Sequence, residues 1–376
     1  MGTPVMDGRS SASQSGAAIN RFYTSRAWID GHAETQLHHV SCWAGVSEIA
    51  AFPDLHVGKH GPVGCAVLAD RIYPQLIGND IGCGMSLFQL DLPRRKLKLE
   101  RAVRRIRVLS APLPYPQHDR LSEVGLPNDL SPDALGTIGG GNHFCEVQAL
   151  GDVDPSEDSG LDPTLTYLLV HSGSRGLGAS IFAALPGSAL DGLLGEDAEA
   201  YRNQHDQAAR WASLNRQIIA ERTAEALRAE ARLIVDAPHN LLTRTPQGWL
   251  HRKGAAVAGP CVPVAGSRAT ESYLVRAQDN PAALASLSHG AGRRYDRSSM
   301  HGRVRGKMSD LAAMTHTPFG GRVICEDRDL LIEEAPHAYK SADHVVQDLE
   351  DTGVATRIAT LTPLLTFKKT REEART

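Results

Sequence analysis

The sequence predicts an α+β fold, arranged as a single large domain with mixed β-sheets in the core and helices around them. The chain has 376 residues and contains neither an internal repeat nor a convincing domain linker. Short apolar runs of strand length recur along it, and one much longer helical pattern covers residues 197–230. Hydrophobic residues make up 41% of the chain, which is enough for a substantial core.

The composition argues against several broad classes of protein. The formal net charge is −3, so no overall positive field points to long nucleic acids, although a local basic groove is compatible with this balance. No apolar run approaches the ~18 residues of a membrane span. The six cysteines form no CxxC pair and there is no secretory leader, which indicates reduced thiols and a cytoplasmic location.

The first half of the chain gives mainly structural signals. Residues 1–18 are rich in Ser, Gly and Ala and predict a disordered tail. Residues 53–59 predict a turn, on which Asp54 is either a carboxylate near a metal or a residue bonded to its own turn. Alternation predicts a strand over 86–92. Helical spacing predicts a helix over 94–107, whose several cations either face solvent or contact RNA.

The most informative stretch runs from residue 79 to residue 85 and reads NDIGCGM. It places Asp80 three residues before Cys83, with a glycine on each side of the thiol. The glycines allow the backbone to turn tightly, so that both side chains can reach one cation. A thiolate can also bridge two cations.

A second stretch, residues 136–146, reads GTIGGGNHFCE. Three consecutive glycines remove every side chain where a phosphate or a ribose would approach backbone N–H groups. Asn142 and His143 follow at once, and Glu146 comes three residues later. The combination indicates a ligand site more strongly than a glycine run does alone.

Two further histidines follow predicted strands. His171 comes directly after the apolar run 165–170, and His239 comes shortly after the run 233–235. Arg175, four residues beyond His171, offers a planar fork for a phosphate, or else it is a structural residue beside a capping serine.

The last histidine of interest is His289, in the stretch SHGAGRR at 288–294. The small residues beside it leave its imidazole open to a bulky ligand. Upstream, residues 262–267 predict a strand that enters a small-residue turn at Ser267, where backbone amides are suited to bind a nucleotide. Lys253, in a basic cluster, is a candidate phosphate contact.

One carboxylate, one thiol and three imidazoles suffice for two cations if the thiolate is shared. These mixed oxygen, nitrogen and sulfur donors suit Zn, Mn or Fe, and the set alone does not choose among them. His289 is then left free to act as a nucleophile. The five candidate metal ligands are Asp80, Cys83, His143, His171 and His239.

The same motifs carry a family resemblance that covers nearly everything from Pro53 to Lys368. In chain order they are NDIGCGM, GTIGGGNHFCE, HSGSRGLG, a strand ending in HN, HRKGA, SHGAGR, EEAPHAYK and PLLTFK. The sequence resembles the RtcB family of RNA-splicing ligases, in which these motifs occur in this order. The resemblance implies an RtcB-like catalytic domain over residues 19–368, followed by a charged tail over 369–376.

The resemblance also implies an activity. It is that of a ligase dependent on GTP and two Mn(II) ions, which joins an RNA 3′-phosphate or 2′,3′-cyclic phosphate to a 5′-hydroxyl in RNA repair or tRNA splicing. By motif, His289 becomes the catalytic histidine that takes GMP, and Cys83 is shared by both metal ions. The residues implied to contact the nucleotide are Asn142, Glu146, Ser267, His289, Gly290, Ala291, Gly292, Tyr339 and Lys368. The candidate contacts for substrate phosphates are Asp54, Arg175, Lys253 and Arg293.

The sequence departs from the family at several points. The segments on both sides of HRKGA are short, and Arg268-Ala269 replaces the usual Met-Gly. The shortened form resembles a subgroup encoded beside a peptide-release-factor homologue, which implies a partner in the repair of ribosomal or transfer RNA. Two other functions use the same residues: a metal-dependent cyclic phosphodiesterase, or a non-catalytic protein that binds RNA ends.

Overall fold

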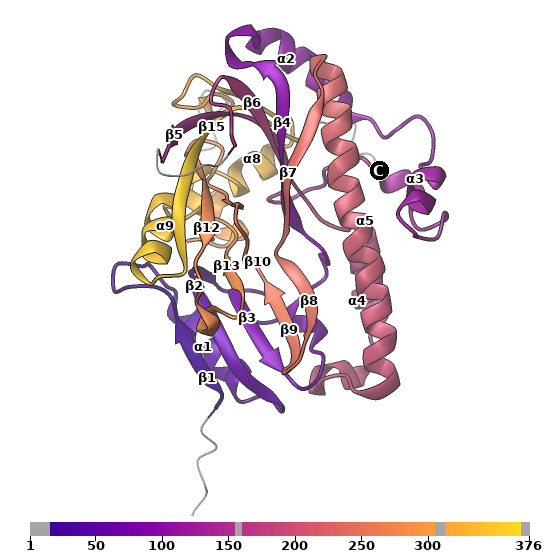
Figure 1. Ribbon diagram of the computed structural model, residues 1–376, viewed down its shortest axis with the longest axis vertical. Coiled ribbons are helices and arrows are strands. Elements are labelled where there is room, and N and C mark those ends of the chain that lie inside the picture. The colour runs from indigo at the N-terminus through magenta and orange to yellow at the C-terminus, as the bar shows by residue number, and fades with distance from the viewer. Residues whose placement is uncertain (1–15, 155–159, 305–312, 370–376) are drawn as a thin grey trace, which may run out of the picture.

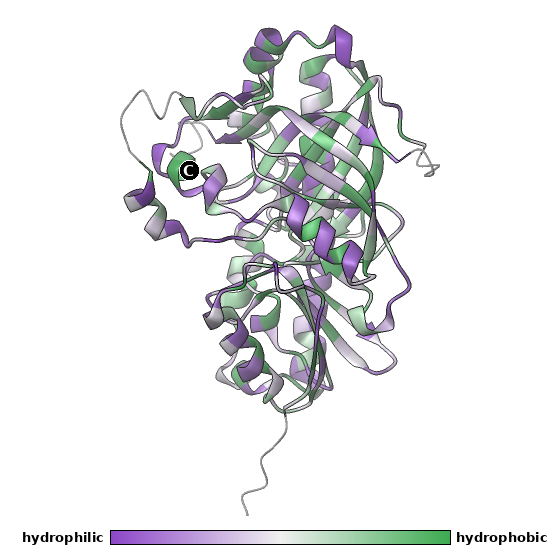
Figure 2. Ribbon diagram, turned by 90° about the vertical axis from the view of Figure 1, so that its left-hand side faces the viewer, coloured by the Kyte–Doolittle hydropathy of each residue, from purple (hydrophilic) through white to green (hydrophobic). Residues whose placement is uncertain are grey.

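Three sheets with helices around them make up the structure, a computed structural model that describes residues 16–154, 160–304 and 313–369 (Figure 1). This arrangement confirms the predicted α+β class. The strands of the sheets are largely hydrophobic, whereas much of the helical surface is hydrophilic, as Figure 2 shows. No helix in the described part of the chain is long and apolar enough to cross a membrane.

The largest sheet has eight strands. In spatial order they are β11 (Val262–Val264), β12 (Ser272–Ala277), β15 (Ala355–Lys369), β5 (Phe144–Val153), β6 (Leu165–Ser172), β4 (Gly84–Pro93) and β7 (Ala231–Pro238), and β14 (Arg322–Cys325) pairs with β15. The predicted strands 86–92, 165–170 and 233–235 are thereby confirmed, each with slightly wider bounds.

Four neighbouring strands of this sheet, β5, β6, β4 and β7, run antiparallel to one another. His171 on β6 lies opposite Phe144 on β5 and Met85 on β4, and Gly84 lies opposite Pro238 on β7. Neighbouring strands alternate in direction. The first residues of β5 and β4 therefore lie beside the last residues of β6 and β7, at the same end of these strands. Segments far apart in the sequence therefore converge there.

A second sheet has five strands and a third has two. The five-stranded sheet contains β1 (Ala18–Arg21), β2 (Val46–His56), β3 (Val63–Ala69), β9 (Gly248–Lys253) and β8 (Asn240–Thr245) in that order. The two-stranded sheet pairs β10 (Ala255–Val257) with β13 (Ser286–Ser288), so that the chain after β13 reaches the same region as the converging strand ends.

The helix α5 (Gly195–Leu227) is the longest in the described residues and confirms the helix predicted over 197–230. It runs along the large sheet and contacts both β4 and β6 (Figure 1). Ile219 and Ala220 of this helix pack with Phe88 and Leu168 of the sheet in one hydrophobic cluster. Burial of this amphipathic face holds the helix against the sheet.

Shorter helices cover the remaining surfaces. They are α1 (Gly31–Ser41), α2 (Leu99–Ile106), α3 (His118–Glu123), α4 (Gly176–Ala183), α6 (Arg297–Arg303), α8 (Arg328–Glu333) and α9 (Ala342–Asp351). Helix α9 packs on β15, β12 and β2, and α8 packs with α6 near the end of the chain.

Three predicted boundaries need correction. Residues 53–59 were expected as a turn, but β2 continues to His56 because it pairs with β3, and Asp54 is fully buried. The helix expected over 94–107 is interrupted, since a 3₁₀ turn covers Arg94–Lys96 before α2 begins. The tail predicted over 1–18 ends earlier, because Ala18 already pairs in β1, while residues 1–15 lie outside the described residues.

Candidate metal centre and nucleotide pocket

The turn that precedes β4 carries the first two candidate metal ligands. Gly82 adopts φ +69°, and a Cβ atom there would lie 2.7 Å from the Cα of Ala209 on α5. Only glycine allows this close approach of turn and helix. The amide of Cys83 donates to the carbonyl of Asp80 at 3.2 Å, which closes the turn and keeps the carboxylate and the thiol near each other.

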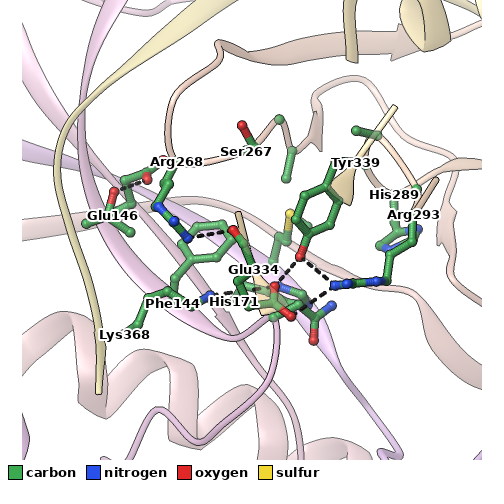
Figure 3. A pocket seen from close by; sticks show the side chains of 18 of the residues that line it. Phe144, Glu146, His171, Ser267, Arg268, His289, Arg293, Glu334, Tyr339 and Lys368 are labelled. Atoms are coloured by element: carbon green, nitrogen blue, oxygen red, sulfur yellow. Dashed lines mark hydrogen bonds and ion pairs between the residues drawn. The ribbon is translucent and has the colours of Figure 1, made fainter. Parts of the chain in front are cut away.

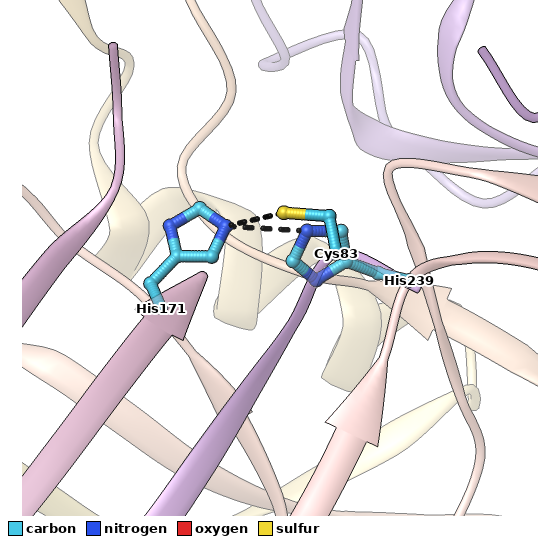
Figure 4. A group of neighbouring side chains, drawn as sticks. All are labelled: Cys83, His171 and His239. Atoms are coloured by element: carbon cyan, nitrogen blue, oxygen red, sulfur yellow. Dashed lines mark hydrogen bonds between the residues drawn. The ribbon is translucent and has the colours of Figure 1, made fainter. Parts of the chain in front are cut away.

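The five candidate ligands form two groups that share the thiol. In the first group, the Nε2 atom of His143 lies 2.9 Å from Oδ2 of Asp80 and 3.3 Å from Sγ of Cys83. In the second, Nε2 of His171 lies 3.2 Å from the same sulfur and 3.3 Å from Nε2 of His239 (Figure 4). The structure therefore brings all five residues to one place, as the sequence predicted.

The orientation of these side chains fits bound cations. Nδ1 of His143 donates to the carbonyl of Ile138 at 3.1 Å, which leaves the lone pair of Nε2 facing Asp80 and Cys83. Nε2 of His171 and Nε2 of His239 face each other, although two neutral imidazoles gain little from such a contact unless a proton or a cation lies between them. Two cations that share the sulfur satisfy this donor set.

The site is buried, and burial sets the protonation of its free groups. Burial and the neighbouring charge of Asp80 raise the pKa of the Cys83 thiol well above its ordinary value. Burial, together with nearby positive groups, lowers the pKa values of His171 and His239 well below theirs. The imidazoles are thus neutral and ready to act as ligands, while a cation must displace the thiol proton.

Two adjacent side chains of α5 hold the ligand-bearing segments together. Arg216, 1% exposed, donates from Nη1 to the carbonyls of Gly82 at 2.7 Å and Ser172 at 2.8 Å, and pairs with Asp236 of β7 at 2.8 Å. Asn215 donates to the carbonyl of Thr137 at 3.0 Å, in the loop before His143. These bonds tie the turn before β4, the end of β6, β7 and the glycine-rich loop to one helix.

His289 lies beside the candidate metal ligands, with its ring centroid 4.5 Å from that of His239. Its Nδ1 atom is 2.7 Å from Oδ2 of Asp54 and 2.7 Å from the carbonyl of Gly254. Both partners accept a hydrogen bond, so Nδ1 carries the proton and Nε2 keeps its lone pair. Among the described residues no hydrogen-bond partner contacts Nε2.

Asp54 is itself fixed in place. It is fully buried and also accepts a hydrogen bond from the hydroxyl of Ser288 at 2.8 Å. The carboxylate therefore orients His289, a role closer to the predicted helper carboxylate than to a contact with substrate phosphate.

A pocket of about 830 Å³, counting its open side, extends from His289. Its walls include all nine residues that the family resemblance assigns to the nucleotide, and also Arg293. Within the described chain, the other candidate phosphate contacts, Asp54, Arg175 and Lys253, do not line it. The amine of Lys253 instead donates to the carbonyl of Gln75 at 2.9 Å, because its side chain is packed inside the protein.

Arg175 lies at the edge of the metal centre. It has φ +57°, a conformation that non-glycine residues rarely adopt. Its Nε donates to the hydroxyl of Thr137 at 3.1 Å, and a Cβ atom on Gly139 would overlap its guanidinium. Glycine at 139 leaves room for this guanidinium and adopts φ +101°, which other residues rarely adopt, so this part of the glycine-rich loop packs around protein as well as leaving room for a ligand.

One wall of the pocket is organised by Glu334, which the sequence did not single out. Its carboxylate accepts a hydrogen bond from Tyr339 and pairs with Arg293 at 3.0 Å, Arg297 at 3.3 Å and Lys368 at 3.9 Å (Figure 3). Burial by itself raises the pKa of Glu334, but Lys368 and Arg293 outweigh it and keep the pKa below its ordinary value. A charged carboxylate therefore fixes two of the residues assigned to the nucleotide.

Arg268, one of the departures from the family, also lines this pocket. It is 7% exposed and donates to the carbonyls of Glu334 at 2.5 Å and Leu331 at 2.9 Å. These carbonyls belong to the end of α8, where backbone acceptors are unpaired and the helix dipole favours a cation. Arg268 thus caps α8 and supports the wall that carries Glu334.

The family comparison agrees with this site. The family model described as tRNA-splicing ligase RtcB matches residues 36–128 and 117–369. RNA-splicing ligase RtcB2 of Escherichia coli is 40% identical over 357 residues, which cover 91% of this chain and 93% of that protein. RNA-splicing ligase RtcB of Mycobacterium tuberculosis is 28% identical, with 84% and 95% covered, and tRNA-splicing ligase RtcB of Methanococcus maripaludis is 25% identical, with 88% and 90% covered.

The fold, the site and these matches define an enzyme of the ligase class. The chain belongs to the RtcB family.

Proposed function

We propose that this enzyme is a GTP- and Mn(II)-dependent RNA ligase that joins an RNA 3′-phosphate or 2′,3′-cyclic phosphate to a 5′-hydroxyl through a histidine–GMP intermediate on His289. The observation that carries the proposal is the hydrogen bonding of His289. Asp54 and Gly254 hold Nδ1 at 2.7 Å each, and the nucleophilic Nε2 stays unpaired beside the pocket that all nine residues assigned to the nucleotide line.

The first step is guanylylation of the enzyme. Nε2 of His289 attacks the α-phosphorus of GTP, a phosphorus–nitrogen bond forms, and pyrophosphate leaves with the electron pair of the broken bond. Positive charge develops on the ring, and the buried carboxylate of Asp54 stabilises it through Nδ1–H. Two Mn(II) ions held by Asp80, Cys83, His143, His171 and His239 would supply charge neutralisation for the phosphates and activate water for opening a cyclic phosphate.

The next steps transfer the nucleotide and join the RNA. An oxygen of the RNA 3′-phosphate attacks the phosphorus of the bound GMP, and the electron pair returns to His289. The 5′-hydroxyl of the second RNA end then attacks the activated 3′-phosphate, loses its proton and displaces GMP. Arg293, on the wall of the pocket, is the remaining candidate contact for one of these phosphates. Its guanidinium already donates to Glu334 at 3.0 Å and to the carbonyls of Glu333 at 2.8 Å and Tyr295 at 2.9 Å, so a phosphate there would have to share these hydrogen bonds.

The nucleotide base is proposed to lie against Glu146, Tyr339 and Lys368. Glu146 is 4% exposed and accepts hydrogen bonds from Thr366 and, at 2.6 Å, from Gln148. Burial raises its pKa to about 7, although these hydrogen bonds and Lys368 act in the opposite direction. A carboxyl group in this position accepts hydrogen bonds from two N–H groups of guanine, one at each oxygen, only when it is deprotonated.

We therefore expect GTP affinity to rise with pH through about pH 7. The stability of the free protein should change in the opposite direction. Glu146 keeps its proton up to about pH 7 in the native state, whereas the unfolded chain releases it at lower pH. The free energy of unfolding should therefore fall as pH rises to about 7. Glu146→Gln should remove both trends, and above about pH 8 it should stabilise the free protein by up to roughly 3 kcal/mol. Urea unfolding and GTP titration at several pH values test this. Trends that persist in Glu146→Gln would contradict it.

Ligation of defined RNA ends tests the proposed function against a cyclic phosphodiesterase. With GTP and Mn(II), the enzyme should join an RNA that ends in a 2′,3′-cyclic phosphate to one that begins with a 5′-hydroxyl. His289→Ala should not join the two RNAs. RNA whose cyclic phosphate has been opened should accumulate instead, because the opening step needs only the metal ions and not His289. GTP-independent opening without joining by the unaltered enzyme would favour the phosphodiesterase, and RNA binding without turnover would favour an end-binding protein.

The remaining expectations from the resemblance are part of the same proposal. The catalytic domain is proposed to span residues 19–368, with the charged segment 369–376 outside it. A release-factor homologue is proposed as a partner in the same pathway. Co-purification of the two proteins from the native cell, or its absence, tests that partner.

A further inference from the structure

Helix α2 and the turn before it carry a dense positive charge. Residues 94–107 contain eight lysines and arginines and a single carboxylate, Glu100, in a chain whose net charge is −3. On the side of α2 that faces β14, charges are paired: Arg107 lies 2.5 Å from Glu326, and Glu100 lies 2.9 Å from Arg322. On this side, positive and negative side chains neutralise each other within the protein.

The other side of the segment forms a hollow without such balance, here called the basic hollow. Its volume is about 480 Å³, counting its open side, and its apolar floor comes partly from the last turn of α5. Four cations line it and no carboxylate does: Lys96, Lys98, Arg101 and Arg105. In the described part of the chain, none of these four side chains makes an ion pair or a hydrogen bond.

The charges nearest to Arg105 are also positive. Partial burial, Arg228 and Arg101 together lower its pKa, and no carboxylate acts in the opposite direction. Arg228 is exposed at the end of α5 and directly follows Leu227, which lines the hollow. Cations held together without counter-charges repel one another, and an anion that enters relieves this repulsion.

We propose that the basic hollow binds the phosphate backbone of the RNA substrate at a distance from its reacting ends. The identity of the anion as RNA rests on the proposed function, and the cation cluster itself does not. Strand β4 connects the two sites: it begins at Gly84, directly after Cys83, and ends at Pro93, directly after Leu92, which lines the hollow. Ten residues at about 3.3 Å each place the hollow roughly 30 Å from the metal centre.

This separation makes the proposal specific for RNA length. A helical RNA strand is A-form and rises somewhat less per nucleotide than the roughly 3.4 Å of DNA, so an RNA stem must extend on the order of ten nucleotides from its reacting end to reach the hollow. A shorter RNA occupies the catalytic site alone. The hollow should therefore contribute to the binding of stem-containing RNAs and not to that of short oligonucleotides.

The test compares a double variant, Lys96→Gln with Arg101→Gln, with the unaltered full chain. RNA binding is measured without GTP, so that the result does not depend on ligation. For a hairpin of about 30 nucleotides, affinity should fall roughly tenfold, and the slope of log K against log salt should become less negative by about 2. For an oligonucleotide of about three nucleotides, which is too short to span roughly 30 Å even when extended, affinity should stay the same. Equal losses for both RNAs, or no loss for either, would overturn the proposal.

Two controls complete the experiment. Arg71→Gln with Arg202→Gln removes the same charge from two surface arginines already paired with carboxylates, Arg71 with Asp70 and Arg202 with Glu199. This variant should bind both RNAs normally. Inorganic phosphate added at constant ionic strength distinguishes a site for small anions: if it abolishes the hairpin's advantage at low millimolar concentration, the hollow binds free phosphate and the RNA assignment is wrong.

Discussion

Replacing Cys83 with alanine should empty both cation positions at once and reduce ligation by at least about 100-fold. The thiol is the only member common to the two ligand groups, so its loss leaves Asp80 with His143 on one side and His171 with His239 on the other. Two donors hold a divalent cation far less tightly than three. Metal analysis after equilibration with Mn(II) and dialysis measures the effect.

Cys145→Ala is the matched control for this experiment. Its thiol is fully buried, like that of Cys83, but it lies 3.4 Å from the hydroxyl of Thr223 and belongs to neither ligand group. The control should keep its metal and its activity. If Cys83→Ala retains two equivalents of Mn(II), the sulfur does not bridge the ions, and the shared-ligand geometry is wrong.

Replacing Arg216 with methionine should produce the largest loss of stability, on the order of 3–5 kcal/mol. The change leaves Asp236 as a charge without its partner, and it leaves the carbonyls of Gly82 and Ser172 without their donor. Since both carbonyls sit next to candidate metal ligands, Mn(II) affinity should also fall. Thermal unfolding without metal and Mn(II) titration of the folded protein separate the two effects.

Two further variants test whether Arg216 positions the candidate metal ligands. Arg216→Lys keeps the charge but cannot reach all of these acceptors, so it should recover stability better than metal affinity. Arg210→Met, at an exposed site on the same helix, should change neither by much. If Arg216→Met folds less stably but binds Mn(II) as tightly as the unaltered protein, Arg216 is a structural residue only.

The convergence of the candidate metal ligands was predictable from the sequence because these residues stand at strand ends or in glycine-rich turns. An antiparallel sheet collects the ends of adjacent strands at one edge, so histidines beyond apolar runs, such as His171 and His239, meet there. The sequence did not show which strands would be neighbours in the sheet. Strand β4 lies between β6 and β7, and this order is fixed by long-range pairing rather than by local residue pattern.

A helper role for Asp54 was one of the two roles predicted, but its place within a strand was not predictable, for a similar reason. Pro53 and Gly58 gave the local signal of a turn, but pairing with β3 extends β2 through this segment and buries the carboxylate against His289. Here pairing between strands, and not the local turn preference, determines the backbone conformation. Arg216 shows the opposite case: its helix was predicted correctly, yet an arginine in a helical pattern is usually exposed, and nothing local marks this one as buried.

The pocket wall formed by Glu334 and Arg268 required the structure. The four partners of Glu334 come from three segments late in the chain, and only the fold brings them to one carboxylate: Arg293 with Arg297, Tyr339, and Lys368. The structure also explains why arginine stands at position 268, where the family usually has methionine: its guanidinium caps the end of α8.

The site at which GMP becomes attached is the decisive observation. The full chain is incubated with labelled GTP and Mn(II), digested under alkaline conditions and analysed by mass spectrometry. GMP should appear on the peptide that contains His289 and be released by acid. The adduct should vanish in His289→Ala with the metal content unchanged, and persist in His337→Ala, an exposed histidine that belongs neither to the candidate metal ligands nor to the pocket lining. GMP on any other residue, or no adduct in a protein that still joins RNA, would contradict the proposed mechanism.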